Sequence, residues 1–290
     1  MNTENPPSSG PGAATRERAP QTPRSDRNAI RTQTQRLVRT MARTITDYGL
    51  IEAGDRIMVA ISGGKDSYTM LDLLWSLRAK APIDFEILAF HLDQGQPGYD
   101  NVALNAWLES FGAPYRIHRE DTYSAVKKLV EGTSKTYCAP CSRLRRGVLY
   151  TWAEELGCNK IALGHHREDA LETLLLNLFY AGKLEAMPAR YTTNDGRFEV
   201  IRPLIECDEA TIAERSRAVG YPILPCNLCG SQAGLKRVQM KKLLTSLEGD
   251  IPDLRNVMVR ALKNVRPSHL LDREVATAWA EAADRFEPRR

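Results

Sequence analysis

The chain has 290 residues, of which 42% are hydrophobic and 26% are charged, and its formal net charge is +4. This composition is that of an ordinary globular protein that can build a core without disulfides, and the mild positive charge is compatible with nucleic acid without indicating it. The longest apolar runs, such as 57–61 and 174–176, are far too short to cross a bilayer, and the N-terminus has no apolar signal region. We therefore expect a cytoplasmic protein with no membrane association.

The predicted elements alternate along the chain. Residues 1–30 are rich in Pro, Gly, Ser, Thr and Arg, which predicts a disordered tail. Hydrophobic periodicity then predicts helices over 31–50, 67–77, 101–111, 122–130, 142–157, 168–180 and 209–219. Short apolar runs predict strands over 57–61, 85–90, 115–118, 160–163 and 200–201, with a hairpin at Asn194-Asp195-Gly196.

Strands that alternate with helices predict an α/β fold with a doubly wound parallel sheet, an N-terminal helix and a helical C-terminal region. The expected divisions are a disordered tail (1–30), an α/β domain (31–205), a mostly helical region (206–272) and a helical or disordered tail (273–290). The α/β domain carries one Cys-x2-Cys pair and the helical region carries a second.

A glycine-containing loop, Ser62-Gly63-Gly64-Lys65-Asp66-Ser67, lies between a predicted strand and a predicted helix. Glycines bring backbone amides close to an anion, a helix N-terminus attracts negative charge, and Lys65 adds a full positive charge. The loop therefore predicts a phosphate site. The alternative is a plain Gly-Gly turn with a helix cap, which the preceding buried strand disfavours.

Two more polar segments follow predicted strands, where ligands of open α/β sheets bind. Asp93 ends the second strand and is placed to meet nucleotide or magnesium; the alternative is a loop or helix-capping Asp. The segment 164–169 begins with Gly164 and the adjacent His165 and His166, and ends at Asp169. We expect Asp169 to orient one histidine or to contact the magnesium of a bound nucleotide, the alternative being a solvated loop with a capping carboxylate.

The chain has six cysteines, four of them in two Cys-x2-Cys pairs: Cys138 and Cys141, and Cys226 and Cys229. Two pairs offer four thiolates, enough for structural zinc or for an iron–sulfur cluster. Their separation is too long for a compact zinc finger and fits two loops that meet at one site. The alternative is two unrelated pairs of free thiols, while Cys158 and Cys207 are expected to be ordinary buried residues.

Two basic groups are candidates for contact with RNA phosphates. Arg143, Arg145 and Arg146 follow the first cysteine pair at helical spacing. A later helix carries Lys236, Arg237, Lys241 and Lys242. The alternative for both groups is a solvated helix face.

The loop at 62–67 resembles the PP-loop of the N-type ATP pyrophosphatases. That resemblance implies that the loop holds the pyrophosphate of ATP while a substrate oxygen is adenylated, and that Ala60 and Ile61 lie near the adenosine. The segment 164–169, with Glu172 and Thr173 after it, is similar to the Gly-His-His-x-Asp-Asp stretch of PP-loop tRNA-modifying enzymes, with Glu168 at the first acidic place.

Longer segments resemble the tRNA 2-thiocytidine synthetase family, and the likeness runs from about residue 35 to 271. The segments are Cys-x2-Cys-Ser-Arg-Leu-Arg-Arg-Gly (138–147), Pro-Cys-Asn-Leu-Cys-Gly-Ser-Gln (225–232), Asp-Gln-Gly-Gln-Pro-Gly (93–98), Asn-Leu-Phe-Tyr (177–180), Ile-Arg-Pro-Leu (201–204) and Pro-Ser-His-Leu (267–270).

This resemblance implies a [4Fe-4S] cluster held by Cys138, Cys141 and Cys226, with the fourth iron open to the sulfur that is transferred. It implies binding of ATP and Mg2+ by Ser62, Gly63, Gly64, Lys65, Asp66, Ser67, Asp93, Gly164, His165 and Asp169. Lys65, Asp66, Asp93 and Cys229 are the implied catalytic residues, although the division of roles between Cys226 and Cys229 stays open.

The implied reaction is adenylation of the C2 oxygen of cytidine 32 in the tRNA anticodon loop, followed by displacement of AMP by sulfur. A homodimer and a cysteine desulfurase as sulfur source are implied as partners. Two other functions are compatible with the sequence. One is a PP-loop ligase of the lysidine-forming type, and the other is a non-catalytic RNA-binding module stabilised by zinc.

Overall fold

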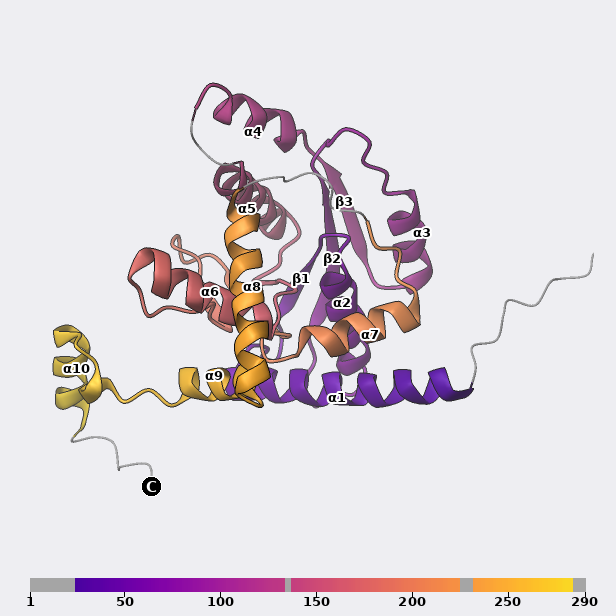
Figure 1. Ribbon diagram of the computed structural model, residues 1–290. Coiled ribbons are helices and arrows are strands. Elements are labelled where there is room, and N and C mark those ends of the chain that lie inside the picture. The colour runs from indigo at the N-terminus through magenta and orange to yellow at the C-terminus, as the bar shows by residue number, and fades with distance from the viewer. Residues whose placement is uncertain (1–23, 134–136, 225–231, 284–290) are drawn as a thin grey trace, which may run out of the picture.

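The computed structural model describes residues 24–133, 137–224 and 232–283. Its centre is a six-stranded sheet in the order β3-β2-β1-β4-β6-β5 (Figure 1). The strands are β1 (Arg56–Ile61), β2 (Glu86–Asp93), β3 (Tyr115–Arg119), β4 (Lys160–Ala162), β5 (Arg190–Thr192) and β6 (Glu199–Ile201). All neighbouring pairs are parallel except β5 and β6, which form the antiparallel hairpin expected around Asn194-Asp195-Gly196. The doubly wound parallel sheet is confirmed.

The described residues form ten α-helices, which lie on both faces of this sheet and, toward the C-terminal end, beyond it (Figure 1). They are α1 (Arg24–Tyr48), α2 (Lys65–Arg78), α3 (Val102–Phe111), α4 (Thr122–Val130), α5 (Cys138–Glu155), α6 (Arg167–Leu176), α7 (Glu209–Val219), α8 (Gln232–Asp250), α9 (Leu254–Lys263) and α10 (Arg273–Ala283). A π-helical turn, η1 (Asn177–Ala181), extends α6, and a 3-10 turn, η2 (Pro267–His269), precedes α10.

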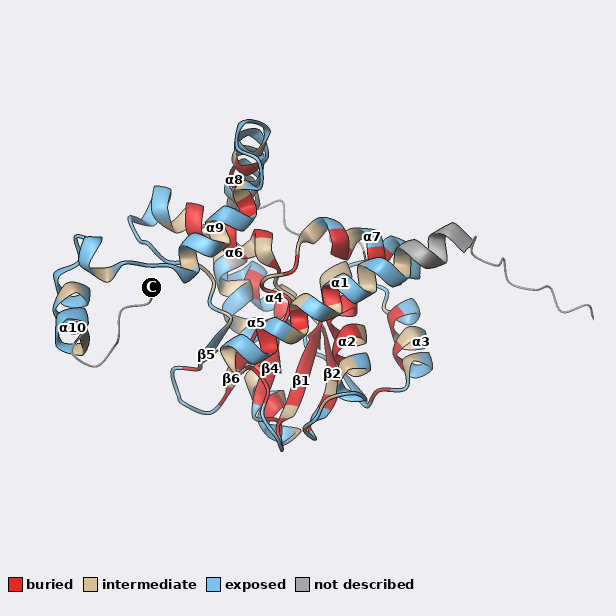
Figure 2. Ribbon diagram, turned by 90° about the horizontal axis from the view of Figure 1, so that it is seen from below, coloured by how far each residue is buried: buried red, intermediate tan, exposed pale blue. Residues whose placement is uncertain are grey.

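Strand β1 divides the core because successive side chains of a strand point to opposite faces. Ile57, Val59 and Ile61 pack with α1, α2, α3 and α7, whereas Met58 and Ala60 pack with α5. Figure 2 shows the central strands buried between these layers. The continuous apolar run therefore reports burial on both faces, as in other parallel sheets.

Helix α1 begins earlier than expected. Residues 24–30, assigned from composition to a disordered tail, are helical, and residues 1–23 lie outside the described part of the chain. Adding a residue to an existing helix requires far less free energy than starting one, so polar residues can extend a helix that is anchored by its packed part. Leu37 and Met41 provide that anchor in the core.

Among the other differences from the expected boundaries, two affect the site or its surroundings. Helix α5 begins at Cys138 instead of residue 142, so both cysteines of the first pair occupy its first turn. The single helix expected over 168–180 is α6 followed by η1. There the Asn177 side chain donates to Glu185 O at 2.8 Å, and Asn177 O accepts from Lys183 N at 3.0 Å. These contacts close a turn that periodicity does not reveal.

Candidate active site

The carboxyl ends of β1, β2 and β4 meet at one edge of the sheet. The chain runs outward in one direction from β1 to β2 and in the other from β4 to β6, so this edge is a topological switch point, where open α/β sheets bind ligands. The loop 62–67 follows β1 there, and α2 begins at Lys65.

Hydrogen bonds fix the loop. Ser62 N donates to Ser67 Oγ at 3.1 Å, and Ser67 Oγ donates to Gly64 O at 2.9 Å. Gly63 has a φ of +82°, and its carbonyl accepts from Leu224 N at 2.9 Å. A Cβ at Gly63 would lie 2.6 Å from Leu224 Cδ1. Both the backbone conformation and the close approach of Leu224 therefore require glycine.

Gly164 lies against the start of α2. A Cβ on Gly164 would lie 3.0 Å from Ser67 N and 3.1 Å from Asp66 C, both backbone atoms. Glycine at this position lets the loop after β4 approach the loop after β1. The structure therefore brings Gly164 to the phosphate loop, and its contact with nucleotide stays a prediction.

Lys65 is held by carboxylates from two helices. Its Nζ lies 3.1 Å from Asp66 and 3.2 Å from Glu209 Oε1 at the start of α7, and Glu209 Oε2 lies 2.6 Å from Lys241 Nζ on α8. Burial acts to lower the pKa of Lys65, but the two carboxylates outweigh it and raise the pKa above its ordinary value. Lys65 is therefore a stable cation beside the loop.

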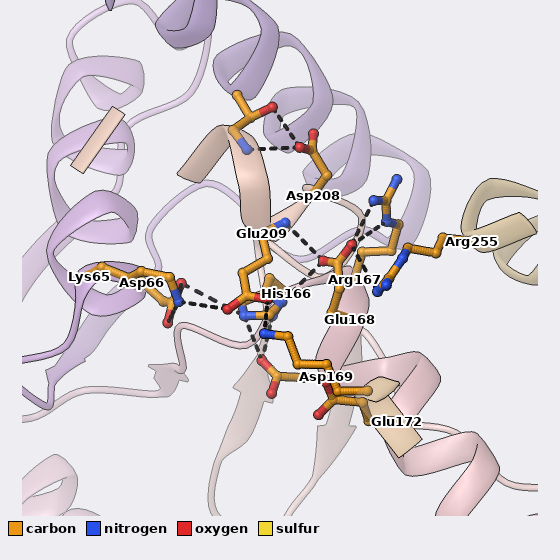
Figure 3. A network of polar contacts seen from close by, with 12 residues as sticks. Lys65, Asp66, His166, Arg167, Glu168, Asp169, Glu172, Asp208, Glu209 and Arg255 are labelled. Carbon is orange, nitrogen blue, oxygen red and sulfur yellow. Dashed lines mark hydrogen bonds and ion pairs between the residues drawn. The ribbon is translucent and has the colours of Figure 1, made fainter. Parts of the chain in front are cut away.

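His166 is the centre of an acidic cluster (Figure 3). Its Nε2 lies 3.5 Å from Asp169 Oδ2 and 3.8 Å from Asp66 Oδ1, and its Nδ1 lies 3.3 Å from Glu168 Oε2. Burial acts to lower the pKa of His166, but these three carboxylates raise it. Asp169 also accepts from His166 N at 3.0 Å, so it caps α6 as well as facing the imidazole.

Glu168 is buried, and both of its carboxylate oxygens accept hydrogen bonds. It accepts from Arg167 at 2.6 Å and from Glu209 N at 2.8 Å, and Arg255 lies 3.9 Å away. Burial acts to raise the pKa of Glu168, but His166 and Arg167 outweigh it and lower the pKa to about 2. The Glu at the first acidic place of this segment is therefore an anchor that joins α6, α7 and α9.

The adjacent histidine has a different environment, as expected for neighbours that point apart. His165 Nδ1 accepts from Arg202 Nε at 3.2 Å. Burial, with added repulsion from Arg202, lowers the pKa of His165 to about 4. His165 is therefore neutral at pH 7, whereas His166 faces three carboxylates.

Helix α8 contributes to this cluster in a way that the sequence did not indicate. Arg237 NH1 donates to Asp169 Oδ1 at 3.1 Å, and its Nε lies 3.7 Å from Glu172. Arg237 and Lys241 were expected on an RNA-facing or solvated face, but they pair with carboxylates of the cluster. Lys236 and Lys242 are exposed.

A cavity of about 250 Å3 lies beside the loop. It is lined by Ala60, Ile61, Ser62, Gly64, Phe90, Leu92, Gln94, Gln96, Tyr99, Arg145, Leu149 and Leu224. Its lining combines residues of the phosphate loop, apolar side chains, and the polar side chains of Arg145, Gln94 and Gln96. Ala60 and Ile61 were expected near the adenosine, and both line this cavity, which is large enough for a nucleoside.

His91 and Tyr99 brace the cavity wall. His91 Nδ1 lies 2.8 Å from Ile61 O and its Nε2 lies 2.6 Å from Tyr99 Oη, so the ring joins the ends of β1 and β2. Burial lowers the pKa of His91 despite the Ile61 carbonyl. The sequence singled out neither residue, although His91 stands two residues before Asp93.

The described contacts of Asp93 are those of a loop residue, which was the alternative to a nucleotide or magnesium ligand. Its Oδ1 accepts from Gly95 N at 2.9 Å, and its Oδ2 lies 3.8 Å from Arg119 Nε. Among the described residues that line the cavity, Gln94 and Gln96 flank this turn and Asp93 does not appear. Asp93 shapes the loop that presents the glutamines, and direct contact with nucleotide or magnesium stays a prediction.

Cys141, of the first cysteine pair, lies close to the cavity. Cys141 is half-buried and its Sγ lies 3.5 Å from Oε1 of Gln94, a cavity residue. Arg145 and Leu149, four and eight residues further along α5, line the cavity as well, as helical spacing requires. The side chain of Cys138, and Cys226 and Cys229 entirely, lie outside the described residues. Within the described ranges, no group of three or more His, Cys, Asp or Glu residues is arranged to hold a metal ion.

The three arginines of α5 separate into two faces. Arg145 lines the cavity, whereas Arg143 and Arg146 line a groove of about 440 Å3 with Tyr150 and Tyr191 on the side of the β5–β6 hairpin. Both groove arginines are exposed.

None of the helices described here has the length and apolar character of a membrane span.

Comparisons with known proteins agree with this geometry. A family model described as a PP-loop domain matches residues 24–224. A tRNA-cytidine(32) 2-sulfurtransferase of Anaeromyxobacter dehalogenans is 52% identical over 252 residues, which cover 87% of this chain and 86% of that protein. One of Chromohalobacter salexigens is 53% identical over 249 residues, covering 86% and 87%.

Among solved structures, the U34-tRNA thiolase NcsA from Methanococcus maripaludis with its [4Fe-4S] cluster has a TM-score of 0.63 to this chain. The two chains are 20% identical, and the match covers 91% of each. At this identity, the likeness shows a shared fold.

Proposed function

Because this chain belongs to the PP-loop family of tRNA-cytidine(32) 2-sulfurtransferases, we propose that it uses ATP to replace the C2 oxygen of cytidine 32 in tRNA with sulfur. The observation that carries the proposal is the cavity that joins the phosphate loop to Gln94 and, through Gln94, to Cys141. Activation by ATP and delivery of sulfur both need access to one substrate atom, and this cavity lies between the two sets of groups.

The phosphate loop supplies the first chemical step. The C2 oxygen of the cytidine attacks the α-phosphorus of ATP, the α–β phosphoanhydride bond breaks, and pyrophosphate leaves. Amides of the loop, the N-terminus of α2 and the Lys65 ammonium stabilise the charge that develops on the leaving group. Lys65 would then exchange Glu209 for phosphate oxygens, and Glu209 keeps its second partner, Lys241.

Asp66 and Asp169 are suited to the Mg2+ that accompanies ATP. Both carboxylates face Nε2 of His166, from α2 and from α6. Asp66 Oδ1 is buried and makes no hydrogen bond, although Lys65 Nζ lies 3.1 Å away as an ion pair. Oxygen ligands from one or two carboxylates, completed by phosphates and water, are the usual environment of Mg2+.

The cysteines are suited to an iron–sulfur cluster. Cys138 and Cys141 occupy the first turn of α5, at a spacing that places both residues on one helix face, and a helix N-terminus favours thiolates. Leu224, two residues before Cys226, is fixed at the phosphate loop by its bond to Gly63. We assign Cys138, Cys141 and Cys226 as ligands of a [4Fe-4S] cluster, which would supply the binding place for the sulfur. Cys229 is assigned a catalytic role in the same transfer.

Sulfur then forms a bond to C2 as the C2–O bond to AMP breaks, so AMP carries the original oxygen away. A cysteine desulfurase as donor and a homodimer belong to this proposal through the family likeness alone. The names of the relatives disfavour both a lysidine-type ligase and a non-catalytic zinc module.

Separate variants test the two halves of the site. Lys65→Ala should lower the rate of tRNA thiolation about 100-fold, the typical effect of removing one transition-state charge partner, while bound iron stays unchanged. Cys141→Ala should lose bound iron and sulfide, whereas Cys158→Ala, a buried core cysteine on the same face of the sheet, should keep both. Normal thiolation by Lys65→Ala would refute the loop assignment, and normal iron content in Cys141→Ala would refute the ligand assignment.

A further inference from the structure

Four large apolar side chains are exposed within seven consecutive residues after α6. Leu178 is 46% exposed, Phe179 55%, Tyr180 51% and Leu184 65%. We call this surface, Leu178, Phe179, Tyr180 and Leu184, the aromatic ledge. The segment 177–180 also carries part of the family likeness, and neither the nucleotide site nor the cysteines use it.

Hydrogen bonds and packing hold the ledge in a defined conformation. Asn177 fixes its loop through Glu185 O and Lys183 N, and Gly182 ends the π-helical turn with a φ of +62°. Tyr180 Oη donates to Gln239 Oε1 of α8 at 3.3 Å. Below the turn, α6 and α8 pack through a separate apolar cluster that contains Leu171, Leu175, Met240 and Leu244. π-Helical turns often occur at functional sites.

Positive charge accompanies these rings. Lys236 Nζ lies 4.3 Å from the centroid of the Tyr180 ring, and Lys183 is exposed within the same loop. The one acidic residue between 177 and 185 is Glu185. Exposed aromatic rings with interleaved cations are the recognition surface for single-stranded nucleic acid, because bases stack on the rings and phosphates meet the cations.

The ledge and the nucleotide site share two helices. Helix α6 carries Asp169 in its first turn and continues through η1 into the ledge, so about 13 Å of helix separates Asp169 from Leu178. On α8, Lys236 contacts Tyr180 while the next residue, Arg237, pairs with Asp169. α6 and α8 lie side by side (Figure 1). A cytidine that reacts at this ATP site would have neighbouring nucleotides of the same strand within reach of the ledge.

We propose that the aromatic ledge stacks unpaired bases of the substrate tRNA, next to the nucleotide that enters the active site. This inference rests on the proposed function, since it names a contact of the same substrate. Lys183 and Lys236, and the contact of Arg237 with Asp169 in the acidic cluster, favour RNA over a second copy of the chain as the occupant.

Substitution of Phe179 tests stacking separately from apolar contact. Binding of unmodified tRNA transcript to the full-length holoenzyme would be measured at one fixed salt concentration, together with the KM for ATP. Phe179→Ala and Phe179→Leu should each weaken tRNA binding about tenfold, within the range found for loss of one stacked base. Phe179→Trp should bind as tightly as wild type or more tightly, and the KM for ATP should not change. Leu129→Ala on α4, 57% exposed, is the matched control and should bind normally.

A second variant keeps the test decisive if Phe179 variants fold poorly. Lys236→Ala should weaken tRNA binding and lower the slope of log Kd against log salt by about one. Normal tRNA binding by Phe179→Ala would overturn the proposal, as would wild-type affinity of Phe179→Leu, which would indicate apolar contact without stacking. A change from dimer to monomer in Phe179→Ala would assign the ledge to a second copy. If wild type itself neither binds nor thiolates tRNA, the proposed function fails together with the ledge.

Discussion

Glu168 shows at the residue scale how a buried charge joins three helices to the site. Its side chain is 5% exposed and is held by His166, Arg167 and the Glu209 amide. Removing one partner from a buried charge network leaves the others uncompensated. Glu168→Gln should therefore lower the free energy of unfolding at pH 7 by about 3 kcal/mol. Glu86→Gln, at an exposed pair with Arg56, should change it by less than about 1 kcal/mol.

The pH dependence of Glu168→Gln has a defined sign. The folded pKa is lowered to about 2 from 4.5, so the stabilisation by this carboxylate is complete above pH 4.5 and is lost as pH falls toward 2. The difference in unfolding free energy between wild type and variant should narrow over that interval in denaturant titrations. An equal difference at pH 7 and pH 3 would contradict the assigned network.

At this scale, the sequence predicted which residues form the phosphate loop but not their partners. Spacing after a strand was sufficient for Gly63, Gly64 and Lys65, because the loop is local. Glu209 and Arg237 come from α7 and α8, and a pairing between distant segments leaves no local pattern. Asp93 shows a different limit: a strand-end acid fits a ligand and a loop turn equally well. Its described contacts are those of a turn, and its contact with nucleotide or magnesium stays a prediction.

At the scale of elements, the approach of the β4–α6 loop to α2 depends on Gly164. A Cβ there would meet backbone atoms at 3.0 and 3.1 Å, so the first turn of α2 must shift by a few tenths of an ångström. We expect Gly164→Ala to weaken ATP binding about tenfold, measured by equilibrium dialysis or calorimetry. Gly249→Ala in α8, where nothing lies within 4 Å, should leave ATP binding unchanged and stabilise the helix by up to about 1 kcal/mol. Unchanged ATP affinity in Gly164→Ala would show that this contact does not position the loop.

Most helices and strands followed from periodicity, since the β1 run and the helices over 122–130 and 209–219 have strong patterns. The elements that differed are set by other forces. η1 depends on hydrogen bonds of Asn177, and the extension of α1 to Arg24 depends on propagation from a packed segment. Neither cause is visible as hydrophobic spacing.

At the scale of the whole molecule, the arginines of α5 face two different surfaces. Arg145 lines the cavity, while Arg143 and Arg146 line the groove toward β5 and β6. We predict that Arg143→Ala and Arg146→Ala each lower the salt slope of tRNA binding by about one, because each removes one phosphate contact. Arg39→Ala is the control, since α1 packs on the opposite face of the sheet. Unchanged slopes in both groove variants would place the RNA elsewhere.

The assembly of the site also belongs to this scale. The phosphate loop, the segment 164–169 and the first cysteine pair are far apart in sequence, and the parallel sheet brings them to one edge. Strand alternation was enough to predict that edge. The cavity between Gly64 and Gln94 was not predictable, because its walls come from four different segments.

The most direct test of the central claim is mass spectrometry of tRNA nucleosides from cells with and without this gene. We predict that 2-thiocytidine alone disappears when the gene is removed, and that wild type restores it while Cys141→Ala and Lys65→Ala do not. Unchanged 2-thiocytidine in cells that lack the gene, or loss of a different thiolated nucleoside instead, would contradict it.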